Sequence, residues 1–521
     1  MLSRFANQRR LATFVSTVVF TTLSSISADA EISSTSAALT ATGKFHFHHE
    51  GILGTSFDLV VRTDDDVTAG QAEQAVLGEI ERLRKILSTY DSGSEVSRLN
   101  ATGGPMNCSV ELLDVLNAYE SWTARTRGAY NGQLGELLRA WRAAEKIGSA
   151  PDQATLAQLV RSISSSTWTV NACDLTVTRL ASQPLNLDSL GKGYIISKAA
   201  TAVRSAVPSV DGLLINIGGD IFVSNQGEAA RLWQVGIANP MDHADNATPL
   251  TQVLLGNRAI STSAAYERGF TIAGRRYSHI LDPRTGVPAE GIASATVVAT
   301  DSATANALAT TLCVVKPEEG LALVKETPGA ECLIVAANGE QFRSAQFAAL
   351  EVPLVGEAKK ANEAKPGLWP KDFQVTLTFA LKGNLAGSRG GYKRPYVAIW
   401  VDNEKGARVR TIAVWGNKER YFPDLHDWSY GEKDRMDWAA SIARATRSSG
   451  RHRVVWDGRD DSGNPLPRGT YTIFLEANRE HGTYAKQSAK IVCEAEFAKG
   501  VIKAASEFEE GQLAYGTPSS E

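Results

Sequence analysis

The sequence has few cysteines, little net charge and no long apolar run, and each of these shortages argues against a class of protein. Among its 521 residues are only five cysteines, and no two of them have the C-x-x-C spacing of a metal site. Five scattered thiols do not indicate a disulfide-built scaffold, and their odd number leaves at least one unpaired within a monomer. The formal net charge of -3 gives no global attraction to nucleic acid, so no nucleic-acid partner is expected. The cysteines are Cys108, Cys173, Cys313, Cys332 and Cys493.

The beginning of the chain has the three parts of a secretory signal peptide. Three arginines lie among the first ten residues, and the uncharged run over 11–23 is too short and threonine-rich for a comfortable membrane span. Ala28-Asp29-Ala30 then offers the small-x-small pattern that signal peptidase requires. We predict a signal peptide over residues 1–30, a disordered lead-in over 31–44, and a periplasmic or other extracytoplasmic location. An uncleaved anchor in the inner membrane is the alternative.

Changes in composition divide the rest of the chain. A chain of this length exceeds one ordinary hydrophobic core, so two or three domains are expected. Helical and strand patterns alternate irregularly over residues 45–355, which predicts an α+β (mixed α/β) domain. A polar, charged stretch over 356–368 is typical of a linker. Alternating strands over 369–498 predict an all-β, immunoglobulin-like sandwich, and polar residues 499–521 predict a flexible tail.

Hydrophobic periodicity places the main elements. In the first domain, apolar residues three and four apart predict helices over residues 69–87, 112–126 and 195–207. Short apolar runs predict strands over residues 54–63, 212–217, 233–237 and 293–298. In the second domain, strands are expected over residues 373–381, 396–402, 409–415, 453–456 and 470–477.

Three residue clusters have a structural and a functional interpretation. The histidines near the mature start either precede a strand in solvent or bind a metal. The tryptophans of the second domain either pack in its core or form a sugar-stacking face. The aspartates of the second domain form either a charged turn or a calcium site, although the spacing is not that of an EF-hand. The clusters are His46, His48 and His49; Trp400, Trp415, Trp428, Trp438 and Trp456; and Asp457, Asp460 and Asp461.

Two glycine-containing strings can bring the backbone close to a ligand. In Asn186-Leu-Asp-Ser-Leu-Gly-Lys-Gly-Tyr194, the glycines are expected in a loop that feeds a helix N-terminus, and Lys192 can place a charge beside a phosphate. The spacing is not that of a Walker loop, so a tight strand-to-helix turn is the structural alternative. In Ile215-Asn-Ile-Gly-Gly-Asp220, the glycines allow the same close approach or form a plain β-turn.

Two further strings supply a proton carrier and oxygen donors. Ser278-His-Ile-Leu-Asp-Pro-Arg-Thr-Gly286 contains His279, the best candidate here for proton transfer near neutral pH, just before an Asp-Pro turn. In Ala299-Thr-Asp-Ser-Ala-Thr-Ala-Asn-Ala-Leu-Ala-Thr310, Asn306 and Thr310 share one helix face. Their side-chain oxygens suit a hard cation such as magnesium, although an Ala-rich packing helix has the same pattern.

Together and in this order, the four strings resemble the ApbE family of FAD:protein FMN transferases. The resemblance covers nearly all of residues 50–350, and its most specific part is H-x-x-D-P-x-T-G. It also includes Leu53-Gly-Thr55, Leu87-Ser-Thr-Tyr-Asp91 and Gly128-Ala-Tyr-Asn131. The remainder resembles a β-rich domain of unknown function that is found fused to this family. The strings that carry this second resemblance are Arg394-Pro-Tyr-Val-Ala-Ile-Trp-Val and Trp456-Asp-Gly-Arg-Asp-Asp-Ser-Gly-Asn-Pro.

The resemblance implies a magnesium-dependent reaction in which FAD is a substrate. A Ser or Thr hydroxyl of a client protein, expected to be a membrane electron-transfer subunit, attacks the FMN phosphorus and AMP leaves. His279 would deprotonate or orient this hydroxyl, and the metal would bind the backbone carbonyl of Ser189 and the side chains of Asn306 and Thr310. The residues implied to contact or surround FAD are Leu53, Tyr90, Ala129, Tyr130, Asn131, Asn186, Asp188, Lys192, Gly218, Gly219, Asp220, Ile280, Asp282 and Thr285.

Three amides stand where the family has acids. The family usually has Asp at the positions of Asn306 and Asn131, and often at that of Asn186. Asn keeps an oxygen donor but removes a negative charge, so we expect a weaker magnesium site unless Asp301 or Asp188 compensates. These changes favour one alternative, a relative that binds or hydrolyses FAD without efficient transfer. A separate alternative is a protein whose C-terminal module acts in adhesion or docking.

Overall fold

The computed structural model of the chain covers the parts that carry the motifs. The expected signal peptide and most of the expected lead-in and linker lie outside the described residues. Within the described ranges, no helix has the length and hydrophobicity needed to cross a membrane. The described residues are 43–163, 168–180, 184–226, 231–265, 268–353, 367–383, 394–416, 419–436, 444, 446–479 and 483–518.

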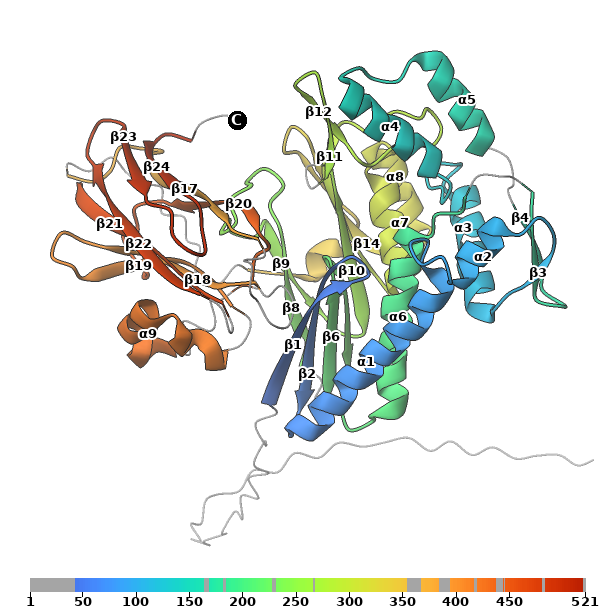
Figure 1. Cartoon of the computed structure of the whole chain (residues 1–521), viewed down its shortest axis with the longest axis horizontal. Helices are drawn as coiled ribbons and strands as arrows, with labels where there is room; N and C mark the ends of the chain where they lie inside the picture. The colour runs from blue at the N-terminus through green and yellow to red at the C-terminus, as the bar shows by residue number, and fades with distance from the viewer. Residues whose placement is uncertain are drawn as a thin grey trace, which may run out of the picture. The chain divides into compact units, whose positions relative to one another are not determined.

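An eight-stranded antiparallel sheet forms the centre of the first domain (Figure 1). Its order is β1-β2-β6-β7-β10-β13-β14-β15, and β1 begins within the expected lead-in because Gly43 pairs with Thr63 of β2. Side chains alternate between the two faces of each strand, so the sheet has two buried faces to cover. The strands are β1 (Gly43–Ile52), β2 (Thr55–Thr63), β6 (Gly212–Ile217), β7 (Asp220–Asn225), β10 (Arg258–Ala264), β13 (Ile292–Ala299), β14 (Glu331–Ala336) and β15 (Gln341–Arg343).

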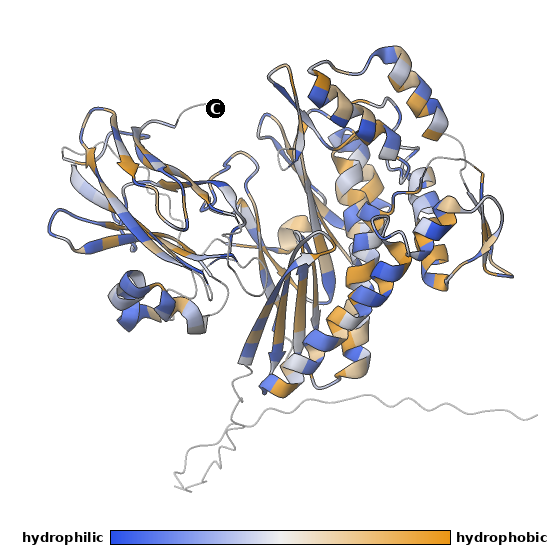
Figure 2. Cartoon of the chain, viewed as in Figure 1, coloured by the Kyte–Doolittle hydropathy of each residue, from blue (hydrophilic) through white to orange (hydrophobic). Residues whose placement is uncertain are grey.

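Helices cover one face of this sheet. Hydrophobic and hydrophilic residues mix along α1 (Figure 2), whose buried residues from Ala69 to Leu87 form one stripe in the main core. α6 and α7 pack against each other and contribute to the same core. The helices are α1 (Asp66–Leu87), α2 (Glu95–Ala101), α3 (Val110–Arg125), α4 (Gly135–Ile147), α5 (Gln153–Ile163), α6 (Asp188–Ala206), α7 (Ser302–Leu312) and α8 (Pro317–Lys325).

A small sheet of order β16-β9-β8 covers the other face, where Trp233 and Val253 pack against residues of the large sheet such as Val298. Two further small sheets have the orders β3-β5-β4 and β11-β12. The strands of the small sheets are β3 (Met106–Asn107), β4 (Trp168–Asn171), β5 (Thr176–Arg179), β8 (Trp233–Ile237), β9 (Thr251–Leu255), β11 (Gly269–Ile272), β12 (Arg275–Ser278) and β16 (Glu351–Val352), with the short 3-10 helix η1 (Phe347–Ala349) before β16.

The second domain is a β-sandwich, as predicted. One sheet has the order β20-β17-β24-β23 and the other β19-β18-β21-β22. The helical elements between β19 and β20 are η2 (Glu419–Asp424), α9 (His426–Glu432) and η3 (Lys433–Arg435). The strands are β17 (Gln374–Leu381), β18 (Tyr396–Asp402), β19 (Arg408–Trp415), β20 (Gly450–Trp456), β21 (Gly469–Asn478), β22 (Tyr484–Cys493), β23 (Ala498–Ile502) and β24 (Gly511–Gly516).

The tryptophans of this domain serve its packing. Trp400, Trp415, Trp428 and Trp456 are at most 2% exposed, so the core interpretation is confirmed for them and a sugar-stacking face is wrong. Trp438 lies outside the described residues. Asp460 accepts hydrogen bonds from the backbone amides of Ser462 and Asn464, which makes this aspartate part of a turn.

The prediction of a flexible tail over residues 499–521 is wrong. β23 extends to Ile502, and β24 lies between β17 and β23 in the interior of its sheet. Leu513 and Tyr515 are 1% exposed and complete the core. Apolar and polar residues alternate only briefly around Leu513 and Tyr515, and the flanking sequence is polar. The burial of this strand therefore becomes evident only from the strands that pair with it.

Candidate functional site

Five polar side chains meet in one hydrogen-bonded network. Ser189 Oγ, in the first turn of α6, donates to Asn306 Oδ1 of α7 at 2.6 Å. The Tyr130 hydroxyl lies 3.0 Å from Ser189 Oγ. Asn306 Nδ2 donates to Asp220 Oδ2 at 3.2 Å, and Lys192 forms an ion pair with the same carboxylate. Asp220 is 4% and Asn306 8% exposed, so the centre of the network is shielded from water.

Two glycines allow the backbones that carry these residues to approach each other. A Cβ atom at Gly193 would lie 2.5 Å from the Ser302 carbonyl oxygen, so only glycine lets α6 cross the start of α7 this closely. Gly218 has a φ of 56° in the tight turn from β6 to β7, which places Asp220 at the start of β7. The two glycines of this second string therefore form the tight turn between β6 and β7.

The loop expected around Gly191 and Gly193 is wrong, because both residues lie within α6, which begins at Asp188 and not near residue 195. Both glycines are buried in the helix, and a Cβ atom at Gly193 would collide with backbone of the next helix. Glycine ordinarily weakens a helix interior, so the sequence favoured a loop. The tertiary contact explains its presence.

The oxygens of this region fit a hard divalent cation. Thr310, one turn after Asn306 on α7, has its Oγ1 3.3 Å from Ser263 Oγ. Hydroxyl, amide and carboxylate oxygens are the donors that Mg²⁺ prefers. Among the described residues, no group of three or more His, Cys, Asp or Glu side chains is placed to hold a metal. The region therefore fits Mg²⁺ by donor type and offers little negative charge.

The acidic residues expected to compensate for Asn306 are engaged elsewhere. Asp301 caps α7 and accepts a hydrogen bond from the Thr304 amide at 2.8 Å. Asp188 accepts one from the Tyr90 hydroxyl. The carboxylate that lies within hydrogen-bond distance of Asn306 is instead that of Asp220. Ser189 contacts Asn306 through its side-chain hydroxyl. Its backbone carbonyl, the group predicted to bind the metal, lies in the first turn of α6.

A pocket of about 250 Å³ lies beside Tyr90, Asn186 and Asp188. The Tyr90 ring is 84% exposed, and its hydroxyl donates to Asp188 Oδ2 at 2.8 Å, a bond that raises the pKa of Tyr90. An exposed ring held at its polar end is a surface on which a planar ligand can stack. The pocket is also lined by Arg139 and Arg142, which the sequence did not single out. Their spacing on α4 is that of any solvated helix face.

His279 is held as a neutral base at the end of β12. Its Nδ1 lies 3.0 Å from the carbonyl oxygen of Arg268, so Nδ1 carries the proton and Nε2 is left with a free lone pair. Burial lowers the pKa of His279. The hydrogen bond to the Arg268 carbonyl opposes this shift, and the charge of Arg268 adds to it.

Several other predicted residues shape the backbone around the site. Asn131 accepts a hydrogen bond from the Gln133 amide, and Asn186 accepts one from the Asp188 amide at the start of α6. Leu53 has a φ of 49° in the turn between β1 and β2. Ala129 and Ile280 are buried in the main core. Gly219 donates its amide to the Asn216 side chain within the β6–β7 turn.

The Asp-Pro-Arg-Thr-Gly turn is closed by its own side chains. Asp282 forms two hydrogen bonds of 2.9 Å with the Arg284 guanidinium, and Thr285 Oγ1 accepts a long one from the Val287 amide. The Trp141 indole donates to the Gly286 carbonyl and ties the turn to α4. In this structure Asp282 and Thr285 stabilise the turn that follows His279.

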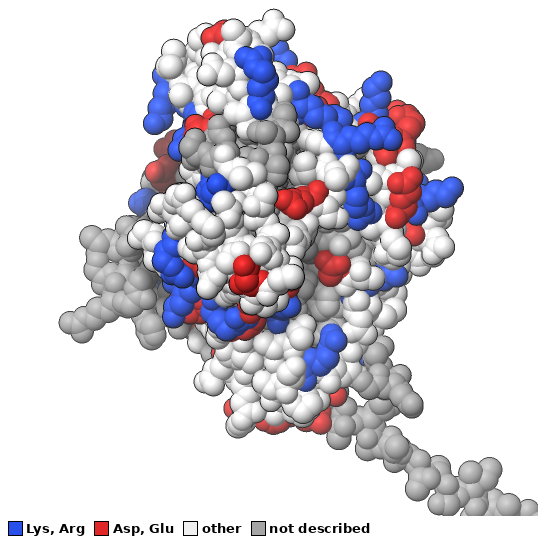
Figure 3. All heavy atoms as spheres, turned by 90° about the vertical axis from the view of Figure 1, so that its right-hand side faces the viewer, with Lys and Arg blue, Asp and Glu red and all other residues white. Residues whose placement is uncertain are grey.

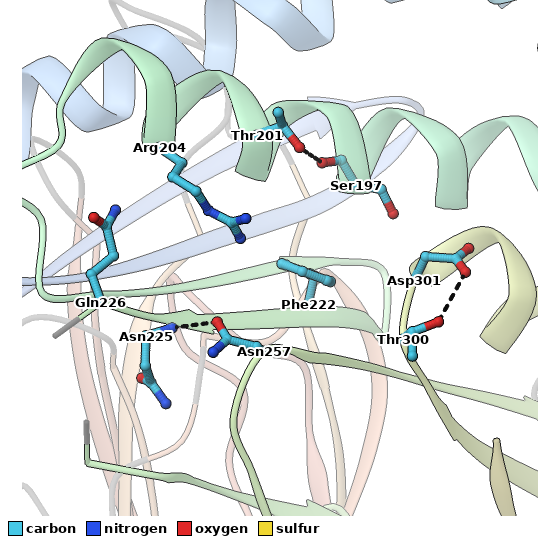
Figure 4. A pocket seen from close by; sticks show the side chains of 9 residues that line it. All are labelled: Ser197, Thr201, Arg204, Phe222, Asn225, Gln226, Asn257, Thr300 and Asp301. Atoms are coloured by element: carbon cyan, nitrogen blue, oxygen red, sulfur yellow. Dashed lines mark hydrogen bonds between the residues drawn. The ribbon is translucent and has the colours of Figure 1, made fainter. Parts of the chain in front are cut away.

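A larger pocket, of about 600 Å³, lies elsewhere. Figure 4 shows Ser197, Thr201 and Arg204 of α6 on one side of it and Phe222 and Asn257 on the other. Asp301, considered above as a compensating acid, lines this pocket, whereas the residues predicted to contact FAD or hold the metal do not. On the molecular face in Figure 3, basic and acidic side chains are interspersed without a broad area of one sign.

Sequence comparison assigns the first domain. Residues 53–334, more than half of the 521-residue chain, match the ApbE family. The chain belongs to the ApbE family. Residues 379–511 match a second family, DUF2271, which is described as a predicted periplasmic protein. The two matches confirm the resemblance of the first domain and its fusion to an additional domain.

Individual ApbE relatives agree with this assignment. A FAD:protein FMN transferase from Treponema pallidum is 28% identical over 281 residues, which cover 51% of this chain and 76% of that protein. One from Klebsiella pneumoniae is 26% identical over 301 residues, which cover 57% of this chain and 85% of that protein. The crystal structure of an ApbE protein from Thermotoga maritima is 25% identical, with a TM-score of 0.53, and the match covers 60% of this chain and all of that one.

Proposed function

We propose that this chain is a FAD:protein FMN transferase, which moves FMN from FAD to a Ser or Thr hydroxyl of a client protein and releases AMP. The network of Ser189, Lys192, Asp220 and Asn306 supports this proposal most. It sets a lysine charge and a group of oxygen donors close to the Tyr90 pocket, as transfer of a phosphorus-bound group requires. A membrane electron-transfer subunit is the client class that we propose.

The residues of the network have separate tasks. Lys192 offers a positive charge to the pyrophosphate of FAD, and Tyr90 offers a ring for stacking. Mg²⁺, held by Asn306, Thr310 and Ser189, would neutralise charge on the phosphate oxygens. Burial raises the pKa of Tyr130 to about 12, so its hydroxyl stays protonated and keeps Ser189 oriented toward Asn306.

His279 would receive the proton of the client. Its Nε2 lone pair takes the hydroxyl proton while a bond forms between the client oxygen and the FMN phosphorus. The bond from that phosphorus to the bridging oxygen of the pyrophosphate breaks, and AMP leaves with this oxygen. No oxidant or reductant is needed.

The direct test incubates the purified chain with FAD, Mg²⁺ and a client domain that carries a Ser/Thr acceptor site. We expect AMP to appear together with a client whose mass has increased by one FMN, as seen by mass spectrometry. AMP and free FMN in equal amounts without a labelled client would favour the alternative of a FAD-hydrolysing relative. FAD binding without AMP would favour a flavin-binding protein.

Thr310 provides a narrower test of the metal donors. Thr310→Val keeps the shape of the side chain but removes an oxygen, so half-maximal transfer should need about ten-fold more Mg²⁺. Thr311→Val is the matched control, because its hydroxyl donates to the Ala307 carbonyl within α7. Equal Mg²⁺ dependence in the two variants would show that Thr310 is not a metal donor.

We also propose that the chain is exported and acts in the periplasm. The signal-peptide pattern over residues 1–30 and the match to a family described as periplasmic support this location. N-terminal sequencing of the native protein should begin near Glu31. A native pool that begins at Met1 in the cytoplasmic fraction would contradict export.

A further inference from the structure

The charge that Asn306 lacks is present one hydrogen bond away. Asn306 Nδ2 donates to Asp220 Oδ2 at 3.2 Å, and this carboxylate comes from the first residue of β7, a strand that contacts α7. The tight Gly218-Gly219 turn and the pairing of β7 with β6 fix its backbone. A buried carboxylate is costly unless it has a charged partner. The partner that the structure provides is Lys192.

The network is electrically neutral as it stands. Lys192 balances Asp220, the amide of Asn306 is neutral, and the hydrogen bonds run on through Ser189 to Tyr130. Nothing in this arrangement draws a divalent cation strongly, because the one carboxylate is already paired. An ionised pyrophosphate beside Lys192 changes this balance, since the lysine then has a second anion to pair with.

We propose that Asp220 is the anionic metal ligand of this chain and supplies from β7 the charge that the family usually supplies at position 306. Lys192 holds the carboxylate in the absence of FAD and pairs with the pyrophosphate when FAD binds, which frees Asp220 for the cation. This inference rests on the proposed function, because it assumes that FAD is the anionic ligand. If Asp220 is the ligand, the metal binds only when FAD is present. An acid at position 306 would instead add a carboxylate without a lysine partner, which could bind the metal in the absence of FAD.

The test measures binding and needs no client. The full chain is titrated with Mn²⁺, whose free ion is followed by its EPR signal, with and without saturating FAD. FAD binding is followed separately by the quenching of flavin fluorescence. We expect wild type to bind Mn²⁺ only when FAD is present. We expect Asn306→Asp to bind Mn²⁺ without FAD.

Asp220→Asn should weaken Mn²⁺ binding to the FAD complex by about ten-fold or more, the scale of losing a charged ligand. The double change Asp220→Asn with Asn306→Asp restores one carboxylate and should recover most of the affinity. Asp301→Asn is the matched control, since Asn caps a helix as well as Asp does, and it should bind Mn²⁺ like wild type.

The outcomes separate the two proposals. Wild-type affinity for Mn²⁺ in the FAD complex of Asp220→Asn would overturn the role of Asp220, even if FMN transfer is intact. If Asp220→Asn no longer binds FAD, the double variant Asp220→Asn with Asn306→Asp becomes the decisive test. Its failure to bind both FAD and Mn²⁺ would also overturn the role of Asp220. If wild type does not bind FAD, the proposed function fails first.

Discussion

Replacing His279 by alanine is expected to slow FMN transfer by about 10²- to 10⁴-fold, the usual contribution of a general base. The structure leaves Nε2 free to accept a proton because Nδ1 is committed to the Arg268 carbonyl. FAD affinity should change little, since the proposed pyrophosphate partner is Lys192 and the proposed stacking ring is Tyr90. Single-turnover transfer at saturating FAD and client measures the effect.

The pH dependence gives an independent check on this role. His279 acts as a base only when neutral, and burial lowers its pKa from the ordinary value of 6.5. The wild-type rate should therefore rise with pH through a midpoint below 6.5 and stay level above it. His279→Ala should lack this rise. A wild-type midpoint at or above 6.5, or the same rise in the variant, would contradict the assignment.

The second large effect concerns stability. Glu507→Ala is expected to destabilise the C-terminal sandwich by about 3–5 kcal/mol, because it breaks a buried ion pair with Arg479. Glu507 is fully buried, and its carboxylate accepts hydrogen bonds of 3.0 and 2.7 Å from Arg479, which is 4% exposed. The Thr483 hydroxyl donates to the other carboxylate oxygen. The pair lies where β21 and the β23–β24 connection meet.

Differential scanning calorimetry of the full chain measures this loss. The transition of the sandwich should fall by roughly 10–20 °C, given the entropy of unfolding of a domain this size. The exposed neighbour Glu509 is the matched control, and Glu509→Ala should change stability by less than about 0.5 kcal/mol. Because the charged linker over residues 356–368 predicts two separately folded domains, FAD binding should survive in Glu507→Ala. Its loss together with the sandwich would show that the first domain depends on the second.

The sequence predicted those elements whose pattern is set by burial on one face. The apolar runs over 212–217 and 233–237 coincide with β6 and β8, because the side chains on one face of each strand are buried in a core. The start of α6 was missed because helix propensity treats Gly193 as a breaker, whereas the approach of Ser302 requires it. β24 was missed because its burial depends on strands on both sides.

The candidate site followed the same division. The motifs selected Tyr130, Ser189, Lys192, Asp220 and Asn306, and the structure joins these five in one network. The motifs could not predict which of these residues contact each other. That Asp220 touches Asn306 depends on the register of β7 beside α7, and that Arg268 orients His279 depends on the path from β11 to β12. Neither contact leaves a local pattern in the chain.

The Tyr130–Ser189–Asn306–Asp220 network also bears on how the protein acquires its activity. Its members come from segments far apart in the chain, and contacts between distant segments carry a large loop-closure cost and form slowly. Tyr130 precedes α4, while Asn306 lies on α7, near the end of the first domain. A chain that ends before α7 lacks Asn306 and cannot form the complete network. The network that we propose for flavin transfer is therefore complete only once α7 has packed beside the start of α6.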